Sequence, residues 1–207
     1  MKPNIYNLFK FLEEKENRPI PLKVKLLHAP EAITPEDLDV KGDLDLKNCK
    51  NLTSLPKGLK VRGDLDLRIC EALESLPENL EVGGDLNLGG CKALESLPKG
   101  LKVKNFYFRN APITSLPDDL DVKGDIDLEN CTKLKFLPKG LTVGGSLILN
   151  NCTNLDSLPE GLTVGGNIHL KNTPLAKKSD EDLRKMIRPK NYFYRLTKGH
   201  IKGKIKK

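Results

Sequence analysis

The chain has 207 residues, of which 38% are hydrophobic and 5% aromatic with no tryptophan, and it carries a net charge of +7. This composition is lean for a globular core but suits an elongated domain built on a thin column of aliphatic side chains. No run of about 18 apolar residues is present, and the first residues lack the apolar region of a secretory signal, so we expect neither a transmembrane helix nor Sec-type export.

Residues 1–31 are predicted to form an N-terminal helical cap for the repeats that follow. Asn4 is a suitable N-cap residue, and the stretch from Arg18 to Pro21 should end the helix because proline cannot continue it. The apolar residues at helical spacing are Ile5, Leu8, Phe9 and Leu12. We expect this apolar face to seal the first end of the repeat array, with a helix lying on a membrane surface as the alternative.

A near-repeat fills residues 32–176 and dominates the chain. Its frame reads V-x-G-D-L-x-L-x-x-C-x-x-L-x-S-L-P-x-G-L-x, and successive valines are 21, 21, 21, 19, 21 and 21 residues apart. The valines are Val40, Val61, Val82, Val103, Val122, Val143 and Val164. A constant period of this length around L-x-L predicts a solenoid, in which each repeat contacts only its neighbours. The predicted fold class is an α+β repeat solenoid with one short parallel strand in each repeat.

Every repeat predicts the same local structure. The segment D-L-x-L reads as a short strand, and the proline of S-L-P keeps the segment on the opposite side extended. The residue before the next leucine is usually glycine, replaced by Asn79 and Asp119 in two copies, and suits a turn with positive φ. In the fourth copy Phe106 and Phe108 take the leucine positions and belong to the core, while Tyr107 between them faces outward.

All five cysteines occupy one repeat position, nine residues after the valine. They are Cys49, Cys70, Cys91, Cys131 and Cys152. No C-x-x-C pair is present, and His28, His169 and His200 do not combine with the cysteines in a zinc-binding pattern. Stacked repeats would place these side chains about 5 Å apart and parallel, which is poor geometry for a disulfide. We expect a ladder of buried, reduced thiols without metal, and therefore a reducing, cytoplasmic location.

A short polar residue stands three positions after each valine, or two positions after it in the shortened fourth copy. The set is Asp43, Asp64, Asp85, Asn105, Asp125, Ser146 and Asn167. Side chains of this kind bond nearby backbone N–H groups, so we expect them to cap turns. Calcium binding is the less favoured interpretation, because calcium-binding β-rolls repeat every nine residues and because Asn and Ser are poor substitutes for a carboxylate ligand.

Residues 177–207 are predicted to form a C-terminal cap and a basic tail. Ser179, with Asp182 three residues later, starts a short helix, and residues 191–196 read as a strand or clamp. The apolar face of the helix is Leu183, Met186 and Ile187. The last 25 residues contain ten Lys and Arg residues and no Asp or Glu, so the rest of the chain has a net charge of −3. Basic and aromatic residues together favour nucleic acid or an anionic membrane as the ligand of the tail. The candidate contacts are Tyr192, Tyr194, Arg195, Lys202 and Lys204.

The units L-x-L-x-x-C-x-x-L and S-L-P-x-G-L-x-V, as in LTSLPKGL and LESLPENL, resemble the repeats of bacterial leucine-rich-repeat proteins. The recurring L-P is similar to the short repeats of YopM- and IpaH-type secreted effectors. This resemblance covers residues 33–176 and implies a leucine-rich-repeat horseshoe with the column between the strand leucines on its concave, partner-binding face. IpaH-type proteins carry a ligase domain with a nucleophilic cysteine after the repeats. No cysteine follows the repeats here, so the resemblance implies a binding platform and not a ligase.

The column between the two strand leucines varies in size and charge, from which we infer that no backbone requirement fixes it. Tyrosine and arginine are over-represented among interface hot spots, so Tyr107 and Arg109 are the preferred contacts. The predicted partner-binding residues are Asp45, Asp66, Asn87, Tyr107, Arg109, Asp127 and His169. A solvated polar face without a partner is the alternative.

The sequence contains no arrangement typical of an active site. No Ser/His/Asp order or phosphate loop is present, and glycine pairs such as Gly83-Gly84 recur with the repeat and belong to turns. We expect no catalytic residues and no cofactor. The predicted function is a monomeric, non-catalytic scaffold that presents its concave face to a protein partner. Export into a host cell, as the effector resemblance implies, is left open, and nucleic-acid or membrane binding by the tail is the alternative function.

Overall fold

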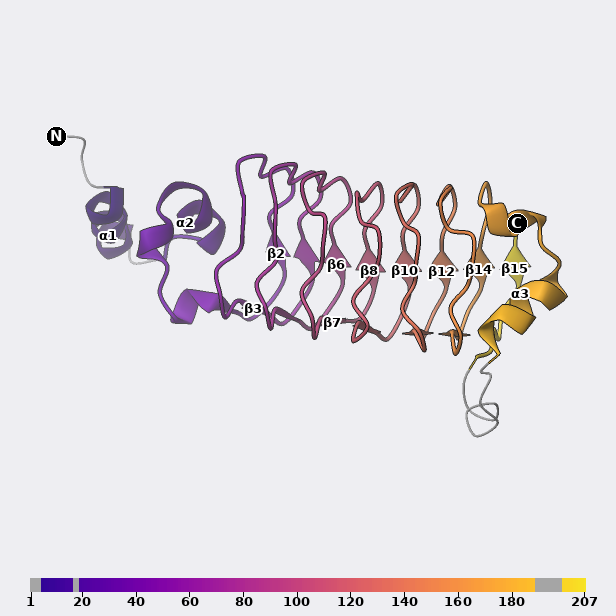
Figure 1. The fold of residues 1–207 in the computed structure, drawn as a ribbon. Coiled ribbons are helices and arrows are strands. Elements are labelled where there is room, and N and C mark those ends of the chain that lie inside the picture. Colours follow the sequence, from indigo (N-terminus) through magenta and orange to yellow (C-terminus); the bar gives the residue numbers. More distant parts are fainter. Residues whose placement is uncertain (1–4, 17–18, 189–198) are drawn as a thin grey trace.

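The computed structural model of the chain describes residues 5–16, 19–188 and 199–207. The repeats stack into a β-solenoid with helices at both ends, which confirms the predicted repeat solenoid (Figure 1). Each repeat contributes two short strands to two parallel sheets, where the sequence predicted one. We number the rungs of the stack by the residue at the valine position, from Val40 in rung 1 to Val164 in rung 7.

Sheet A is formed by the residue pairs that end in the repeat valine. Neighbouring strands pair in register one repeat apart, so that Val40 lies opposite Val61 and Val61 opposite Val82. The strands, in spatial order, are β1 (Asp39–Val40), β3 (Lys60–Val61), β5 (Glu81–Val82), β7 (Lys102–Val103), β9 (Asp121–Val122), β11 (Thr142–Val143) and β13 (Thr163–Val164). In β3 to β13 only the valine is buried, and in β1 both residues are half-buried. One buried side chain in two residues is too short an alternation to be recognised in the sequence.

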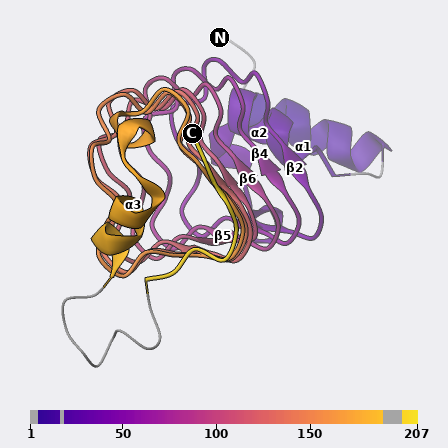
Figure 2. The ribbon, with the colours of Figure 1, turned by 90° about the vertical axis from the view of Figure 1, so that its right-hand side faces the viewer.

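Sheet B contains the predicted D-L-x-L strands. Its strands are β2 (Leu44–Asp45), β4 (Leu65–Asp66), β6 (Leu86–Asn87), β8 (Phe106–Tyr107), β10 (Ile126–Asp127), β12 (Leu147–Ile148), β14 (Ile168–His169) and β15 (Ile205–Lys206). The first residue of each strand from β2 to β14 is buried, and the aliphatic residues form one continuous core. Phe106 and Phe108 are completely buried, with ring centroids 6.0 Å apart, as predicted for core residues. Figure 2 looks along the stack and shows how successive rungs superimpose.

Short polar side chains bind each rung to the next at the corner between the sheets. The Oδ1 atom of Asp43 accepts the backbone N–H of Asp64 at 2.8 Å, and Asp64 does the same for Asp85 at 2.8 Å. The ladder continues through Asn105, Asp125, Ser146 and Asn167. In the shortened rung 4, the side-chain amide of Asn105 replaces the missing backbone donor and bonds Asp85 at 2.9 Å. The prediction that these side chains accept backbone N–H groups is therefore confirmed. The accepted N–H, however, belongs to the next rung and not to a turn of the same rung.

This ladder explains the glycine that precedes the polar residue in rungs 2, 3, 5, 6 and 7; the shortened rung 4 has Lys104 there. A Cβ atom added at Gly84 would lie 2.1 Å from Oδ1 of Asp64 and 2.8 Å from the carbonyl carbon of Gly63. At Gly42 in rung 1, which has no rung before it, an added Cβ would meet nothing within 4 Å. The polar side chain of one rung thus crosses the space that a side chain of the next rung would need.

The cysteines form the predicted ladder of free, buried thiols. Cys70 donates to the carbonyl oxygen of Leu46 at 3.1 Å, and Cys91 donates to that of Leu67 at 3.2 Å. Cys131 and Cys152 make the equivalent bonds in rungs 5 and 6. Each of these four thiols therefore satisfies a buried carbonyl of the preceding rung, which accounts for a small side chain with a weak donor at this position. Cys49, in rung 1, lies 4.0 Å from the carbonyl oxygen of Lys47 in its own rung.

The positive-φ turn before the repeat leucine is confirmed for Asn79, with φ 59°, and for the glycines at this position, such as Gly58 with φ 80°. It is wrong for Asp119, which has no positive φ. Its carboxylate instead accepts the backbone N–H of Gly100 at 2.9 Å.

The N-terminal cap contains α1 (Ile5–Glu16), α2 (Leu22–His28) and the 3-10 turns η1 (Pro30–Ala32) and η2 (Glu36–Leu38). The predicted seal by α1 is wrong, because Leu8 in this helix is 48% exposed and α2 covers the end of the core instead. The buried residue Leu22 of α2 belongs to the core cluster. Asn4 and the side chains of Ile5 and Phe9 lie outside the described residues.

A buried ammonium group holds the cap together. Lys25 of α2 is 4% exposed, and its Nζ atom lies 3.1 Å from Glu13 of α1 and 3.0 Å from Asp37 of η2. A backbone bond from Ile20 and the contact with Lys25 lower the pKa of Glu13. Burial of Asp37 acts in the opposite direction, but bonds from the Thr34 N–H and from Lys25 outweigh it and lower the pKa of that carboxyl.

The C-terminal cap begins with η3 (Pro174–Lys177) and α3 (Asp180–Ile187). Ser179 caps α3 by accepting the N–H of Asp182 at 3.1 Å, as predicted. After the segment that is not described, residues 199–207 return to the stack as an eighth rung. Ile201 bridges to Val164, and Ile205 pairs with Ile168. The predicted basic tail is thus a further half-copy of the repeat, I-K-G-K-I-K, across its last residues.

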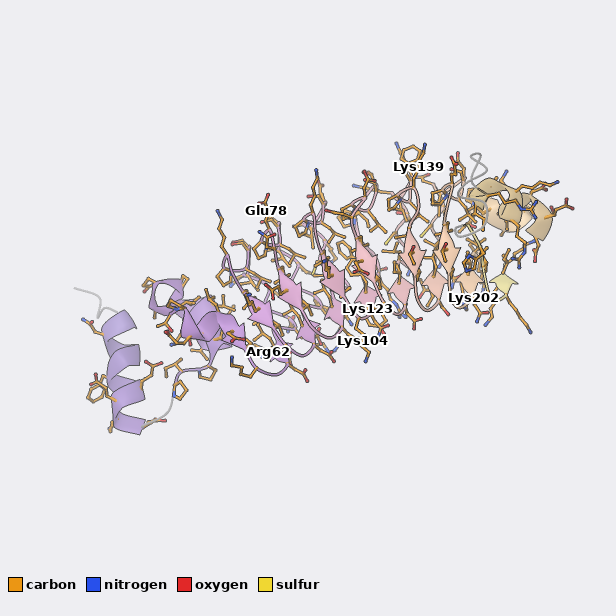
Figure 3. All side chains as sticks on the ribbon, turned by 90° about the horizontal axis from the view of Figure 1, so that it is seen from below. Arg62, Glu78, Lys104, Lys123, Lys139 and Lys202 are labelled. Atoms are coloured by element: carbon orange, nitrogen blue, oxygen red, sulfur yellow. The ribbon has the colours of Figure 1, made fainter. Side chains whose placement is uncertain are left out.

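Charges alternate along the column that follows the repeat proline. The residues are Glu36, Lys57, Glu78, Lys99, Asp118, Lys139 and Glu160. Glu78 and Lys139 lie along one long edge of the stack in Figure 3, and Arg62, Lys104, Lys123 and Lys202 lie along the opposite edge. Opposite charges on neighbouring strands stabilise a sheet and like charges destabilise it. By the same reasoning, the alternation favours the stacking of each rung on the rungs beside it.

We predict that the two glycines compared above respond differently to alanine. Gly84→Ala should lower the free energy of unfolding by about 1–3 kcal/mol, because the added Cβ overlaps the rung before it. Gly42→Ala should change it by less than about 0.5 kcal/mol. Urea denaturation of both variants measures this difference. An equal loss in both would mean that glycine serves the turn itself and not the ladder.

Acid should loosen the N-terminal cap before it loosens the sheets. The folded-state pKa values of Glu13 and Asp37 are lowered, so their contribution to stability is complete above about pH 4 and is lost as the pH falls through the folded values. Amide exchange in α2, corrected for intrinsic rates, should therefore rise between pH 6 and pH 3 relative to sheet B. The variant Lys25→Met, which lacks the ion pairs, should show a smaller rise; the same rise in both would contradict the assignment.

Candidate functional site

Four of the predicted contact residues on sheet B have a structural role. The side chains of Asp45 and Asp66 accept the backbone N–H two residues further on, at 2.8 Å and 3.0 Å. Asn87 and Asp127 make the same bond, at 3.1 Å and 3.0 Å. The inference that no backbone requirement fixes this column is therefore wrong for these four rungs. The capping explains Asp and Asn at these positions without reference to a partner.

The other three rungs depart from this pattern. Tyr107, Ile148 and His169 occupy the same column, are partly exposed, and have side chains that cannot cap a backbone N–H in this way. Tyr107 pairs with Asn87 on one side and Asp127 on the other. The repeat does not require a tyrosine at this position, so Tyr107 can serve a role other than capping.

A second departure lies one turn further along the chain. The residue before the cysteine position, which holds Ala111 and Thr173 in two repeats, adopts a left-handed conformation in all seven repeats. The column reads Asn48, Ile69, Gly90, Asn110, Asn130, Asn151 and Asn172. Asparagine and glycine accept positive φ readily, but a β-branched residue does so only under strain. Ile69 has φ 61°, and it is 41% exposed, so burial does not compensate for the strain. This departure is visible in the sequence, since Ile69 stands in a column that otherwise contains only Asn and Gly.

The neighbouring rung lacks side chains beside Ile69. The N–H of Ile69 donates to the carbonyl of Gly89 at 2.9 Å, and the N–H of Gly90 donates to the carbonyl of Arg109 at 3.1 Å. Gly89 has no positive φ, and its column elsewhere contains long side chains such as Arg68 and Arg109. We call Ile69, Gly89, Gly90, Tyr107 and Arg109 the central patch. Arg68 and Arg109 are two strand spacings apart, about 10 Å, and the column between them has a glycine in place of a long side chain.

Both arginines are held in place by carboxylates. Arg68 forms a two-pronged ion pair with Asp66, and Arg109 donates from Nε to Asp127 at 2.7 Å. Asp127 is 1% exposed, whereas the Arg109 side chain is 53% exposed. Burial and the negative charges of nearby Asp85, Asp125, Asp127 and Asp64 raise the pKa of Tyr107. The tyrosine therefore stays protonated and can donate a hydrogen bond at the centre of the face.

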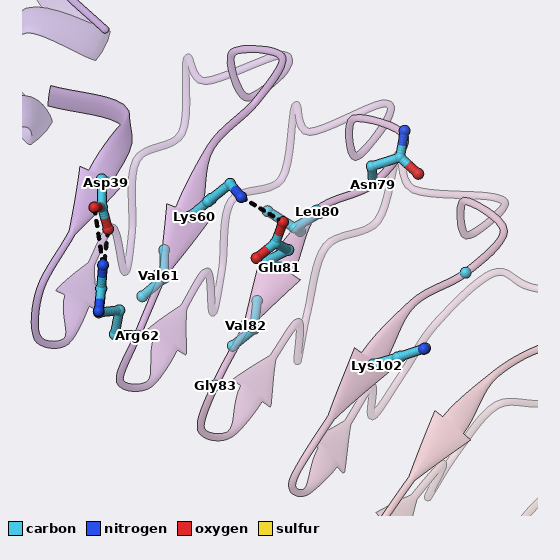
Figure 4. Close-up of a pocket in the computed structure, with 11 residues that line it drawn as sticks. Asp39, Lys60, Val61, Arg62, Asn79, Leu80, Glu81, Val82, Gly83 and Lys102 are labelled. Carbon is cyan, nitrogen blue, oxygen red and sulfur yellow. Dashed lines mark hydrogen bonds and ion pairs between the residues drawn. The ribbon is translucent and has the colours of Figure 1, made fainter. Parts of the chain in front are cut away.

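A depression of about 800 Å³ lies away from this patch, on sheet A (Figure 4). Its charged side chains are largely matched within the chain: Arg62 donates to Asp39 at 3.0 Å, and Lys60 lies 2.7 Å from Glu81. These pairs continue the alternation of charge between rungs. The depression is therefore a surface of structural ion pairs and not a converging set of polar groups.

The remaining predicted residues are dispersed. His169 lies three rungs from Tyr107 in sheet B, and Lys202 and Lys204 belong to rung 8. Tyr192, Tyr194 and Arg195 lie outside the described residues. Burial raises the pKa of Cys70 and Cys131 to about 11 and that of Cys91 and Cys152 to about 12, so these thiols remain protonated and weakly reactive.

Within residues 5–16, 19–188 and 199–207, no group of three or more His, Cys, Asp or Glu side chains is placed to hold a metal ion. No helix of the described chain is long and apolar enough to cross a bilayer. Comparison of the chain with family models, with curated proteins and with solved structures finds no match in any of the three.

Restoring the repeat residue at position 69 should stabilise the fold. Ile69→Asn should raise the free energy of unfolding by about 1 kcal/mol, because asparagine tolerates the left-handed conformation that strains isoleucine. Urea denaturation of the variant and the wild type measures the gain. The reverse change at an equivalent position, Asn130→Ile, should cost a similar amount. A loss of stability in Ile69→Asn would mean that Ile69 makes a favourable contact that outweighs the strain.

Proposed function

We propose that the protein is a non-catalytic scaffold that binds a protein partner through sheet B, centred on the central patch. The observation that carries this proposal is the coincidence of three departures from the repeat in adjacent rungs: a strained, exposed Ile69, a side-chain gap at Gly89, and Tyr107 in place of a capping residue. Strain that the fold does not need is characteristic of functional positions. Glycine permits close approach of another molecule, and tyrosine and arginine are typical anchors.

The likeness of the repeats to bacterial leucine-rich-repeat proteins supports the same proposal, because the corresponding column in those proteins faces the partner. We extend it to a bacterial origin and to an effector-like role in a reducing cytoplasm, where the free cysteines would remain reduced. The absence of reactive thiols among the five cysteines agrees with a scaffold. Binding of nucleic acid or an anionic membrane remains the alternative, with Lys202 and Lys204 exposed on rung 8.

The test uses substitutions that the repeat itself supplies. Ile69→Asn, Gly89→Lys and Tyr107→Asn each introduce the residue type found in the same column of another rung. The triple variant should fold with at least wild-type stability but retain at least about tenfold less of a partner recovered by cross-linking and affinity capture. A matched variant on sheet A, Lys60→Glu/Glu81→Lys, should retain the partner fully.

Equal recovery with the triple variant and the wild type would contradict the proposal. Nuclease treatment of the same samples distinguishes the alternative, because a partner that is lost only after nuclease was held through nucleic acid. Sedimentation velocity of the wild type tests the expected monomer.

A further inference from the structure

The stack ends in an open strand edge. β15 is the last strand of sheet B, and no strand pairs with its outer side among the described residues. The N–H groups of Ile168 and Leu170 donate to the carbonyls of Lys204 and Lys206, at 3.0 Å and 2.7 Å. Since every rung repeats this direction, the N–H groups of Ile205 and Lys207 point away from the stack. No described strand accepts these two donors.

The end rung carries positive charge and no negative charge. Residues 199–207 contain four lysines and neither Asp nor Glu. Lys207 lies 2.6 Å from Asp180 of α3, but Lys202, Lys204 and Lys206 make no ion pair with any described carboxylate. Their side chains therefore present unneutralised charge beside the free N–H groups.

Lys204 departs from the residue type that holds this position in rungs 1 to 7. Its own N–H is accepted by Asn167 at 2.8 Å, so it receives the last bond of the side-chain ladder. In rungs 1 to 7 this position holds Asp, Asn or Ser, whose oxygen accepts an N–H of the following rung. A lysine cannot accept that bond. Instead it offers a cation to an acidic side chain at the same level of an added strand.

Among the described residues, no strand lies beyond this edge. In Figure 2, β15 is the strand nearest the viewer, and α3 lies across the opposite side of the end of the stack. α3 buries Leu183 and Ile187 against the core and leaves the sheet edge uncovered. α3 therefore occupies only one side of this end of the stack. It also obstructs the stacking of a second complete solenoid, which carries its own helical cap at the end that would have to meet this edge.

We propose that the outer edge of rung 8 binds an extended acidic segment of a partner protein, which adds one strand to sheet B. The segment pairs its backbone with Ile205 and Lys207 and places acidic residues beside Lys204 and Lys206, with an apolar residue between them beside Ile205. Main-chain bonds supply the affinity of such strand addition and the side chains supply the specificity. This edge is separate from the central patch, and the inference does not depend on the function proposed there.

The experiment measures amide shifts of the full-length, ¹⁵N-labelled chain with a defined peptide. The probe has the sequence of residues 40–46, VKGDLDL, which places two acidic residues around a leucine. The matched control is VKGKLKL. The acidic peptide should produce saturable shifts of the Ile205 and Lys207 amides, and the control should bind at least about tenfold more weakly.

A charge swap in the protein separates recognition from non-specific attraction. Lys204→Asp/Lys206→Asp introduces the residues that rung 1 holds at the same two positions, Asp43 and Asp45, and should fold normally. It should reverse the preference and bind VKGKLKL more tightly than VKGDLDL. Absence of shifts at millimolar peptide, or an unchanged preference in the swapped variant, would overturn the proposal and leave the lysines as edge protection against aggregation. Concentration-dependent association of the wild type that the swap abolishes would assign the edge to a second copy, and this would overturn the proposed partner.

Discussion

The structure depends on one contact, in which a short polar side chain of each rung accepts a backbone N–H of the next. This bond fixes the spacing of the rungs at the corner where the two sheets meet, and its geometry requires glycine in the following rung. The strands are only two residues long, and backbone bonds from the residues beside them extend the ladder between rungs. The stack therefore combines this backbone ladder with side-chain-to-backbone bonds from the polar column and, in four rungs, from a cysteine.

Because the same bonds recur in every repeat, most residue identities are explained by the neighbouring rung. Solenoid stability is approximately a sum of such nearest-neighbour terms. Positions that depart from the pattern are then conspicuous. Ile69 and Tyr107 add nothing to the stack that Asn would not add equally well or better. Lys204 donates its N–H to Asn167, but its side chain has no oxygen that could accept a further N–H. These departures identify the two surfaces on which both proposals rest.

The solenoid, the thiol ladder and the core phenylalanines could be predicted, because each follows from period or from a single repeated position. Sheet A was not predicted, since one buried valine per strand gives no alternation to detect. The eighth rung was missed because Ile201 lies 37 residues after Val164 and lysine replaces the polar residue of the frame. The capping role of Asp45 and Asp66 depends on backbone geometry beyond the strand, which the sequence does not display. The departure at Ile69, by contrast, can be read from the sequence but was not predicted.

The alternation of charge along the proline column has a consequence for how such a chain evolves. Loss of one repeat would bring Lys57 beside Lys99, two like charges one strand spacing apart. Loss of two consecutive repeats would instead bring Lys57 beside Asp118 and restore the attraction. Sheet A has the same parity, since Asp39, Lys60, Glu81, Lys102 and Asp121 also alternate. Duplication or deletion of two rungs therefore preserves the alternation of charge in both columns, whereas a change of one rung interrupts it.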